Sequence, residues 1–142
     1  MKKTQVIFII LILTLSGCGG KDKVKLSADY LLTTEAIETI NVLKTAYQGK
    51  DIIKLRGISA PEIADRVAGE LFFDSAELSF APRTVRIKDQ SVMVNTNWQG
   101  TWIINNNTFK NRGIAVFVFE GSPLKLVRID GDNPFLIPLA RD

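Results

Sequence analysis

Apolar residues recur every three or four positions between residues 33 and 72, and every second position from residue 76 onward. The first spacing is typical of amphipathic helices, and the second is typical of strands with one buried face. The sequence therefore predicts helices in the first half of the folded region and strands in the second half.

The first predicted helix starts at Thr33 or Thr34, because either hydroxyl can cap its first turn, and it runs to about Gln48. Gly49 then favours termination of the helix. The apolar stripe of this helix, which we expect to face a core, comprises Ala36, Ile37, Ile40, Leu43 and Tyr47.

Two shorter helices are predicted next. Asp51 can cap the first of them, which contains Ile52, Ile53 and Leu55. Ser59-Ala60-Pro61-Glu62 matches a capping box with proline in the first turn, so it predicts a third helix that runs to about Phe72.

The strand pattern begins at Ala76 and is interrupted at Pro82, after which the apolar residues change parity. Proline cannot donate a hydrogen bond within a sheet, so this segment is expected to be an edge strand or to contain a bulge. The next strand alternates clearly. Its apolar side holds Val92, Val94, Thr96, Trp98, Gly100, Trp102 and Ile104, and its polar side holds Asn95, Asn97, Gln99 and Thr101. One covered face and one solvated face are typical of antiparallel sheets.

The segment 113–120 is apolar on both sides, which predicts a central strand that is covered on both faces or that meets a partner. Gly121-Ser122 predicts a hairpin turn. A change of parity near Val127 then predicts a second bulge in the last strand, and turn residues from Asp130 to Pro134 close the sheet.

Helices followed by antiparallel strands predict an α+β domain, with N-terminal helices packed on a curved four-stranded antiparallel sheet. The element order, the helix junction Tyr47-Gln48-Gly49-Lys50-Asp51 and the closing strand Lys125-Leu126-Val127-Arg128-Ile129 resemble the nuclear-transport-factor-2-like family. Members of that family are cone-shaped α+β proteins, and they include ketosteroid isomerase-type enzymes and many binding proteins. The resemblance covers about residues 33 to 135. The cystatin-like half-cone, built on one main helix, is the alternative.

The chain begins with Lys2 and Lys3, followed by an apolar run with one threonine from Val6 to Leu15. This run has half of the roughly 20 residues that a membrane-spanning helix needs. Basic residues, a short apolar stretch and then small residues are typical of an export signal. An ordinary cleaved signal and an uncleaved helix are the alternatives to the interpretation that follows.

Leu15-Ser16-Gly17-Cys18 resembles the lipobox of bacterial lipoproteins. In that family the signal is cut before the cysteine, the thiol receives a diacylglyceryl group and the new amine is acylated, and several acyl chains anchor a protein stably. The resemblance implies a signal peptide at 1–17 cut between Gly17 and Cys18, a lipidated Cys18 with a tether over 18–32, and a single α+β domain over 33–142. Gly19 replaces the aspartate that retains many such lipoproteins in the inner membrane, which implies the outer membrane, facing the periplasm.

The chain has 18 basic and 15 acidic residues, and cleavage would remove two of the basic ones, Lys2 and Lys3. The remaining basic residues form no run, so we expect no nucleic-acid partner. The sequence contains one cysteine and no histidine. These counts exclude an internal disulfide, the usual serine or cysteine triads and zinc sites built from cysteine and histidine. We expect no metal and no cofactor.

The family resemblance implies a pocket between the concave sheet face and the helices. Its candidate lining residues are Tyr47, Trp98, Trp102 and Phe117. Aromatic residues at strand spacing more often form core, so both interpretations stay open. Gly100 leaves room either for a ligand or for the close approach of a helix. Asp74 and Glu70 lie where the third helix meets the sheet, but they belong to no catalytic motif, so no catalytic residue is assigned.

The favoured function is non-enzymatic. It is that of a lipid-anchored envelope domain, held to the membrane through Cys18, which binds a partner protein or a small apolar ligand or pairs with a second copy through the sheet. The alternatives are a small isomerase, dehydratase or hydrolase of the same fold, and an accessory subunit of an envelope assembly or secretion complex.

Overall fold

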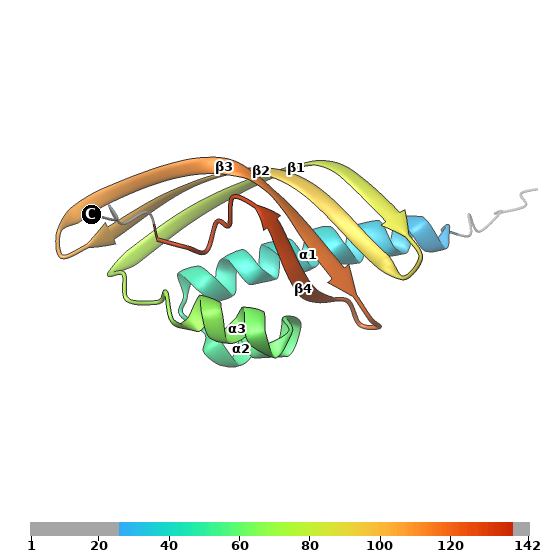
Figure 1. Ribbon diagram of the computed structural model, residues 1–142, viewed down its shortest axis with the longest axis horizontal. Coiled ribbons are helices and arrows are strands. Elements are labelled where there is room, and N and C mark those ends of the chain that lie inside the picture. Colours follow the sequence, from blue (N-terminus) through green and yellow to red (C-terminus); the bar gives the residue numbers. More distant parts are fainter. Residues whose placement is uncertain (1–25, 138–142) are drawn as a thin grey trace, which may run out of the picture.

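The computed structural model describes residues 26–137. The helices and strands, in chain order, are α1 (Ala28–Gln48), α2 (Ile52–Ile58), α3 (Pro61–Ala68), β1 (Ser75–Lys88), β2 (Ser91–Ile104), β3 (Asn107–Glu120) and β4 (Lys125–Gly131). The strands form one antiparallel sheet in the order β1-β2-β3-β4. The sheet arches over the helices, which all lie on its concave side (Figure 1). The predicted α+β architecture is therefore confirmed.

Helix α1 begins earlier than the sequence predicts. Ser27 is its N-cap, and the hydroxyl oxygen of Ser27 accepts a hydrogen bond from the Tyr30 amide at 3.1 Å. Thr34 does not cap the helix, because its hydroxyl donates to the Tyr30 carbonyl at 2.9 Å within the helix. Residues 28–32, which the sequence predicts as part of the tether, are thus helical. The predicted end at Gln48, with Gly49 after it, is confirmed.

The capping box predicted for α3 is wrong. The N-cap is Ala60, which offers no side-chain hydrogen bond, and Ser59 is buried because its extended backbone forms a bridge with Leu126 of β4. The helix ends at Ala68, well before Phe72. The cap at Asp51 is confirmed, since its carboxylate accepts from the Lys54 amide at 2.9 Å.

Both predicted bulges are present. β1 is an edge strand, and its register shifts between Pro82 and Thr84, so Arg83 is the extra residue. In the β3–β4 pair, Val118 lies opposite Arg128 while Phe119 lies opposite Leu126, which leaves Val127 as the extra residue. Each bulge allows the apolar residues on both sides of it to face the same core.

Strand β3 is central in the sheet, as predicted. Its inward side chains Ala115, Phe117 and Phe119 are fully buried. On the outer face, Val118 is buried but the Ile114 side chain is 54% exposed. Between residues 115 and 119 the inward side of the strand is therefore fully buried, and the outer side is buried only in part.

Candidate functional site

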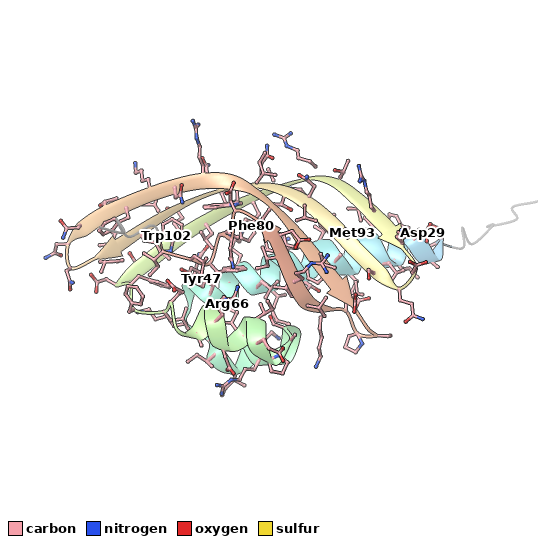
Figure 2. All side chains as sticks on the ribbon, viewed as in Figure 1. Asp29, Tyr47, Arg66, Phe80, Met93 and Trp102 are labelled. Carbon is pink, nitrogen blue, oxygen red and sulfur yellow. The ribbon has the colours of Figure 1, made fainter. Side chains whose placement is uncertain are left out.

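The candidate pocket residues all belong to the hydrophobic core. Tyr47, Trp102 and Phe117 are 0% exposed, and Trp98 is 4% exposed. Figure 2 shows Tyr47, Phe80 and Trp102 between the sheet and the helices. The side chains of Tyr47, Trp102 and Phe117 have no surface that a water molecule could touch, so no water-sized cavity opens onto them.

Hydrogen bonds fix both tryptophans. The indole nitrogen of Trp102 donates to the Tyr47 hydroxyl at 2.8 Å, and that of Trp98 donates to the Asp132 carbonyl at 2.7 Å. The two indole rings meet edge to face, with centroids 6.5 Å apart. These contacts satisfy both buried N–H groups and leave each ring with one defined position.

Burial raises the pKa of Tyr47 to about 12; the hydrogen bond from Trp102 lowers this pKa, and the negative charge of Glu70 raises it further. The phenol therefore stays protonated at neutral pH. A general base needs a pKa near the operating pH, so Tyr47 is unsuited to that role.

The segment after β4 fills the remaining space of the cone. The Phe135 ring lies 5.1 Å from the Tyr47 ring, 6.1 Å from Phe80 and 6.2 Å from Phe117, measured between centroids. Hydrogen bonds hold this segment, because the Ile137 amide donates to the Glu70 carboxylate at 3.2 Å. The sequence offered no signal for this arrangement beyond a short apolar segment, Phe135-Leu136-Ile137, after a turn.

The absence of a side chain at Gly100 makes room for the side chains of Trp102 and Leu78, and not for a ligand or a helix. A Cβ atom at this position would lie 2.4 Å from Cη2 of Trp102 and 2.7 Å from Cδ2 of Leu78. The indole of Trp102 thus folds across the position that any side chain at residue 100 would occupy.

The carboxylates of Asp74, Asp130 and Asp132 serve structural roles. Asp74 accepts a hydrogen bond from the Asn105 amide at 2.8 Å, and so it stabilises the turn between β2 and β3. Asp132 accepts from the Ile114 amide at 3.1 Å, and Asp130 pairs with Arg128 at 2.8 Å. Within residues 26–137, no group of three or more acidic or sulfur side chains could hold a metal ion.

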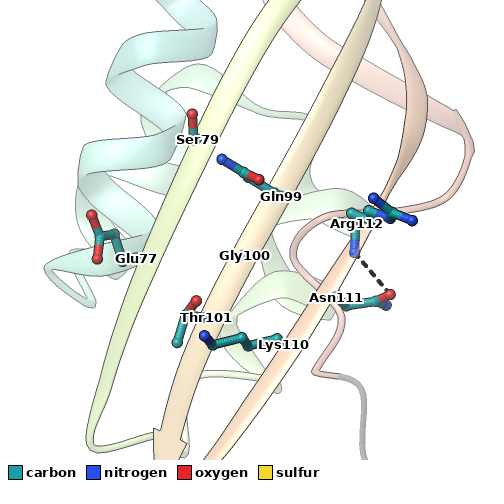
Figure 3. Close-up of a pocket in the computed structure, with 8 residues that line it drawn as sticks. All are labelled: Glu77, Ser79, Gln99, Gly100, Thr101, Lys110, Asn111 and Arg112. Carbon is teal, nitrogen blue, oxygen red and sulfur yellow. Dashed lines mark hydrogen bonds between the residues drawn. The ribbon is translucent and has the colours of Figure 1, made fainter.

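A polar hollow of about 640 Å³ lies on the other, outer face of the sheet. Its lining comes from three adjacent strands and consists of Glu77, Ser79, Gln99, Gly100, Thr101, Lys110, Asn111 and Arg112. Strand pairing sets these residues in rows, with Glu77 opposite Thr101 and Thr101 opposite Lys110 (Figure 3). Gln99 and Thr101, two residues of the polar side of β2 predicted from the sequence, thus line this hollow.

The polar groups of this hollow are available to bind a ligand. Among the described residues, no ion pair involves Glu77, Lys110 or Arg112. A smaller hollow of about 220 Å³ shares Ser79, Gln99 and Arg112 with it, and Trp98 also borders this smaller hollow. The sequence did not predict this site, because its cationic wall and its acidic wall lie on strands far apart in the chain.

No family model matches the chain, and no curated protein matches it either. Among solved structures, a nuclear transport factor 2 (NTF2-like) superfamily protein from Salmonella enterica subsp. enterica serovar Typhimurium str. LT2 superposes with a TM-score of 0.66 at 16% identity, over 81% of this chain and 99% of that one. An LEH-like epoxide hydrolase from M. tuberculosis gives a TM-score of 0.47 at 15% identity, over 70% of this chain and 84% of that one. The first match shows the nuclear-transport-factor-2-like fold.

Proposed function

We propose that this protein is a lipid-anchored, non-enzymatic binding domain of the bacterial cell envelope. In this proposal the domain makes its contacts through the outer face of the sheet and not inside the cone. One contrast supports this choice of surface. The interior is packed around the fully buried rings of Tyr47, Trp102 and Phe135, whereas the large polar hollow is open to solvent on the outer face.

The anchor rests on Leu15-Ser16-Gly17-Cys18, which lies outside the described residues. Cleavage before Cys18 would leave every described helix and strand in the mature chain, since α1 begins at Ala28. Between residues 26 and 137, no helix is long and apolar enough to cross a membrane. With Gly19 after the cysteine, we place the anchor in the outer membrane with the domain in the periplasm.

Metabolic labelling with palmitate tests the anchor. Cys18→Ser should abolish the label and should leave the protein with its signal uncleaved. Ser16→Ala is the matched control: it keeps a small residue before the cleavage point, so labelling and cleavage should persist. Undiminished labelling of Cys18→Ser would rule out the anchor.

Site-specific photo-crosslinking in cells tests the binding face. A photoreactive residue at Gln99, in the outer hollow, should give defined adducts with envelope components. The same residue at Ile53, which is 87% exposed on α2, is the control and should give few adducts. Adducts that form only from position 53 would show that the helical side is the contact surface.

The alternatives differ in what they require. A small isomerase, dehydratase or hydrolase is compatible with the fold. Such an enzyme needs a cavity beside Tyr47 or Trp98, but both side chains are buried in the packed core. An accessory subunit of an envelope complex would use an exposed surface, and so it is one form of the proposed binding role. Fold alone does not decide between these functions.

A further inference from the structure

Basic side chains dominate the outer face of the sheet. Strand register turns outward the basic residues Arg86, Lys88, Lys110, Arg112, Lys125 and Arg128, against the acidic residues Glu77, Glu120 and Asp130, and the bulge residue Arg83 lies beside them. All of these side chains are exposed. Arg83 lies at the bulge. With the side-chain amide of the outward-facing Asn97 oriented so that its oxygen faces Arg83, this oxygen accepts a hydrogen bond from the Arg83 Nε at 3.2 Å.

The helices show no such excess. They carry the basic residues Lys44, Lys54, Arg56 and Arg66 and the acidic residues Asp29, Glu35, Glu38, Glu62 and Asp65. Positive charge is therefore concentrated on one face of a nearly neutral domain. Within the described chain, only Arg128 among the outer-face cations forms an ion pair, with Asp130.

The same face also exposes two aliphatic side chains. Ile114 is 54% exposed, and its partner across the strand pair is Asn97 of the polar row. Ile103, also outward, is 39% exposed. A face that carries both cations and exposed aliphatic groups is typical of surfaces that rest on membranes, where lysine and arginine meet headgroup phosphates and apolar groups enter the headgroup boundary.

The chain before the described structure limits how far this face lies from lipid. From Cys18 to Leu26 there are eight peptide links, which span at most about 28 Å when fully extended. A lipid on Cys18 would therefore hold the domain next to the bilayer, and a short tether of this kind makes a second, weak contact effectively intramolecular.

We propose that the outer face of the sheet docks the domain onto an anionic lipid surface, the leaflet that holds the lipid of Cys18, with the helices turned away. This inference rests on the proposed anchor. The face is convex (Figure 1), but the long basic side chains reach beyond the backbone and charge attraction extends about 8–10 Å at physiological salt. A second copy is a poor occupant, because face-to-face pairing of two copies would oppose like charges.

Vesicle co-sedimentation tests the docking without the lipid anchor. The mature chain, residues 18–142 with Cys18→Ser, retains every described helix and strand. It should bind vesicles of phosphatidylcholine with phosphatidylglycerol, should not bind phosphatidylcholine alone, and should dissociate when NaCl is raised to about 0.5 M. Lys110→Gln combined with Arg112→Gln should weaken binding about 30-fold, since each cation near an anionic surface contributes about fivefold.

The matched control has the same loss of charge on the helical side. Lys54→Gln combined with Arg66→Gln should leave vesicle binding unchanged, because both residues lie on helices α2 and α3. Equal weakening by the two double variants would overturn the docking proposal, since only net charge would then matter. The docking proposal would also be overturned if the unsubstituted domain bound vesicles of phosphatidylcholine alone as well as it binds anionic vesicles.

Single introduced cysteines report orientation, since Cys18 is the only natural cysteine. In the Cys18→Ser background, an environment-sensitive dye on Ile114→Cys should shift to the blue with anionic vesicles, and the same dye on Ile53→Cys should not. A shift only at position 53 would refute the proposed face, and light scattering that shows dimers without vesicles would assign it to a second copy. Because these assays use no lipid anchor, their failure leaves the palmitate result for Cys18 standing.

Discussion

Replacing Phe135 by alanine should lower the free energy of unfolding by about 3–5 kcal/mol, the range for deletion of a buried phenylalanine ring. The ring is fully buried, and it contacts Tyr47 of α1, Phe80 of β1 and Phe117 of β3. These neighbours belong to separate elements that pack against one another, so they cannot easily collapse into the space of the missing ring. We therefore expect a value in the upper part of this range.

Urea denaturation followed by tryptophan fluorescence measures this loss, because Trp98 and Trp102 are both buried in the same core. Phe135→Leu should cost only about 1 kcal/mol, and it keeps the test usable if the alanine variant fails to fold. Phe72→Ala is the matched control. Its ring is 51% exposed, so the loss should stay below about 1 kcal/mol.

The alanine variant should also open a dry cavity beside Tyr47 and Phe117. Dry apolar cavities of this size bind benzene. Benzene should therefore raise the melting temperature of Phe135→Ala and leave that of the natural chain unchanged. A stability loss below about 1 kcal/mol for Phe135→Ala, together with no benzene effect, would refute the conclusion that this ring fills the cone.

Three further changes test the surrounding core. Gly100→Ala should lower the free energy of unfolding by about 1–3 kcal/mol in urea denaturation, since its Cβ would overlap the Trp102 ring. Thr96→Val should raise it by about 1 kcal/mol, because the buried Thr96 hydroxyl oxygen has no hydrogen-bond partner among the described residues. The pKa of Tyr47 is about 12 in the folded chain against 10.0 for an exposed tyrosine, so the unfolded state loses this proton first. Stability should then fall by about 2 kcal/mol between pH 10 and 12, and Tyr47→Phe should remove this slope while leaving the Trp102 indole N–H unpaired.

The core was predictable because it follows from local alternation. Val92, Val94, Trp98 and Trp102 share one parity along β2, and all of them are buried. The interruption at Pro82 marked a bulge, since proline removes a donor from the sheet. These features depend on neighbours within a few residues, and that is the range over which periodicity carries information.

Helix starts were less predictable, because several residues near each start can cap. The sequence predicts Thr33 or Thr34 as the cap of α1, but Ser27 caps it, because the first turns of α1 extend beyond the apolar stripe. Ser59 has a capping residue's side chain, yet tertiary contact with Leu126 holds its backbone in an extended strand-like bridge. A side chain that can cap does so only where packing leaves its backbone at the helix end.

The outer face shows why scattered charges in a sequence do not exclude a charged surface. Arg86, Lys110 and Arg112 lie on two strands and form no run, so the sequence indicated no basic patch. Antiparallel register brings Lys110 and Arg112 onto the same face as Arg86, and the bulge at Arg83 keeps Arg86 outward after the parity change. Register is set by which face of each strand must be buried. The apolar pattern therefore determines the basic face indirectly, because burying Val85 and Ile87 inside forces the residues between and beside them to the outside.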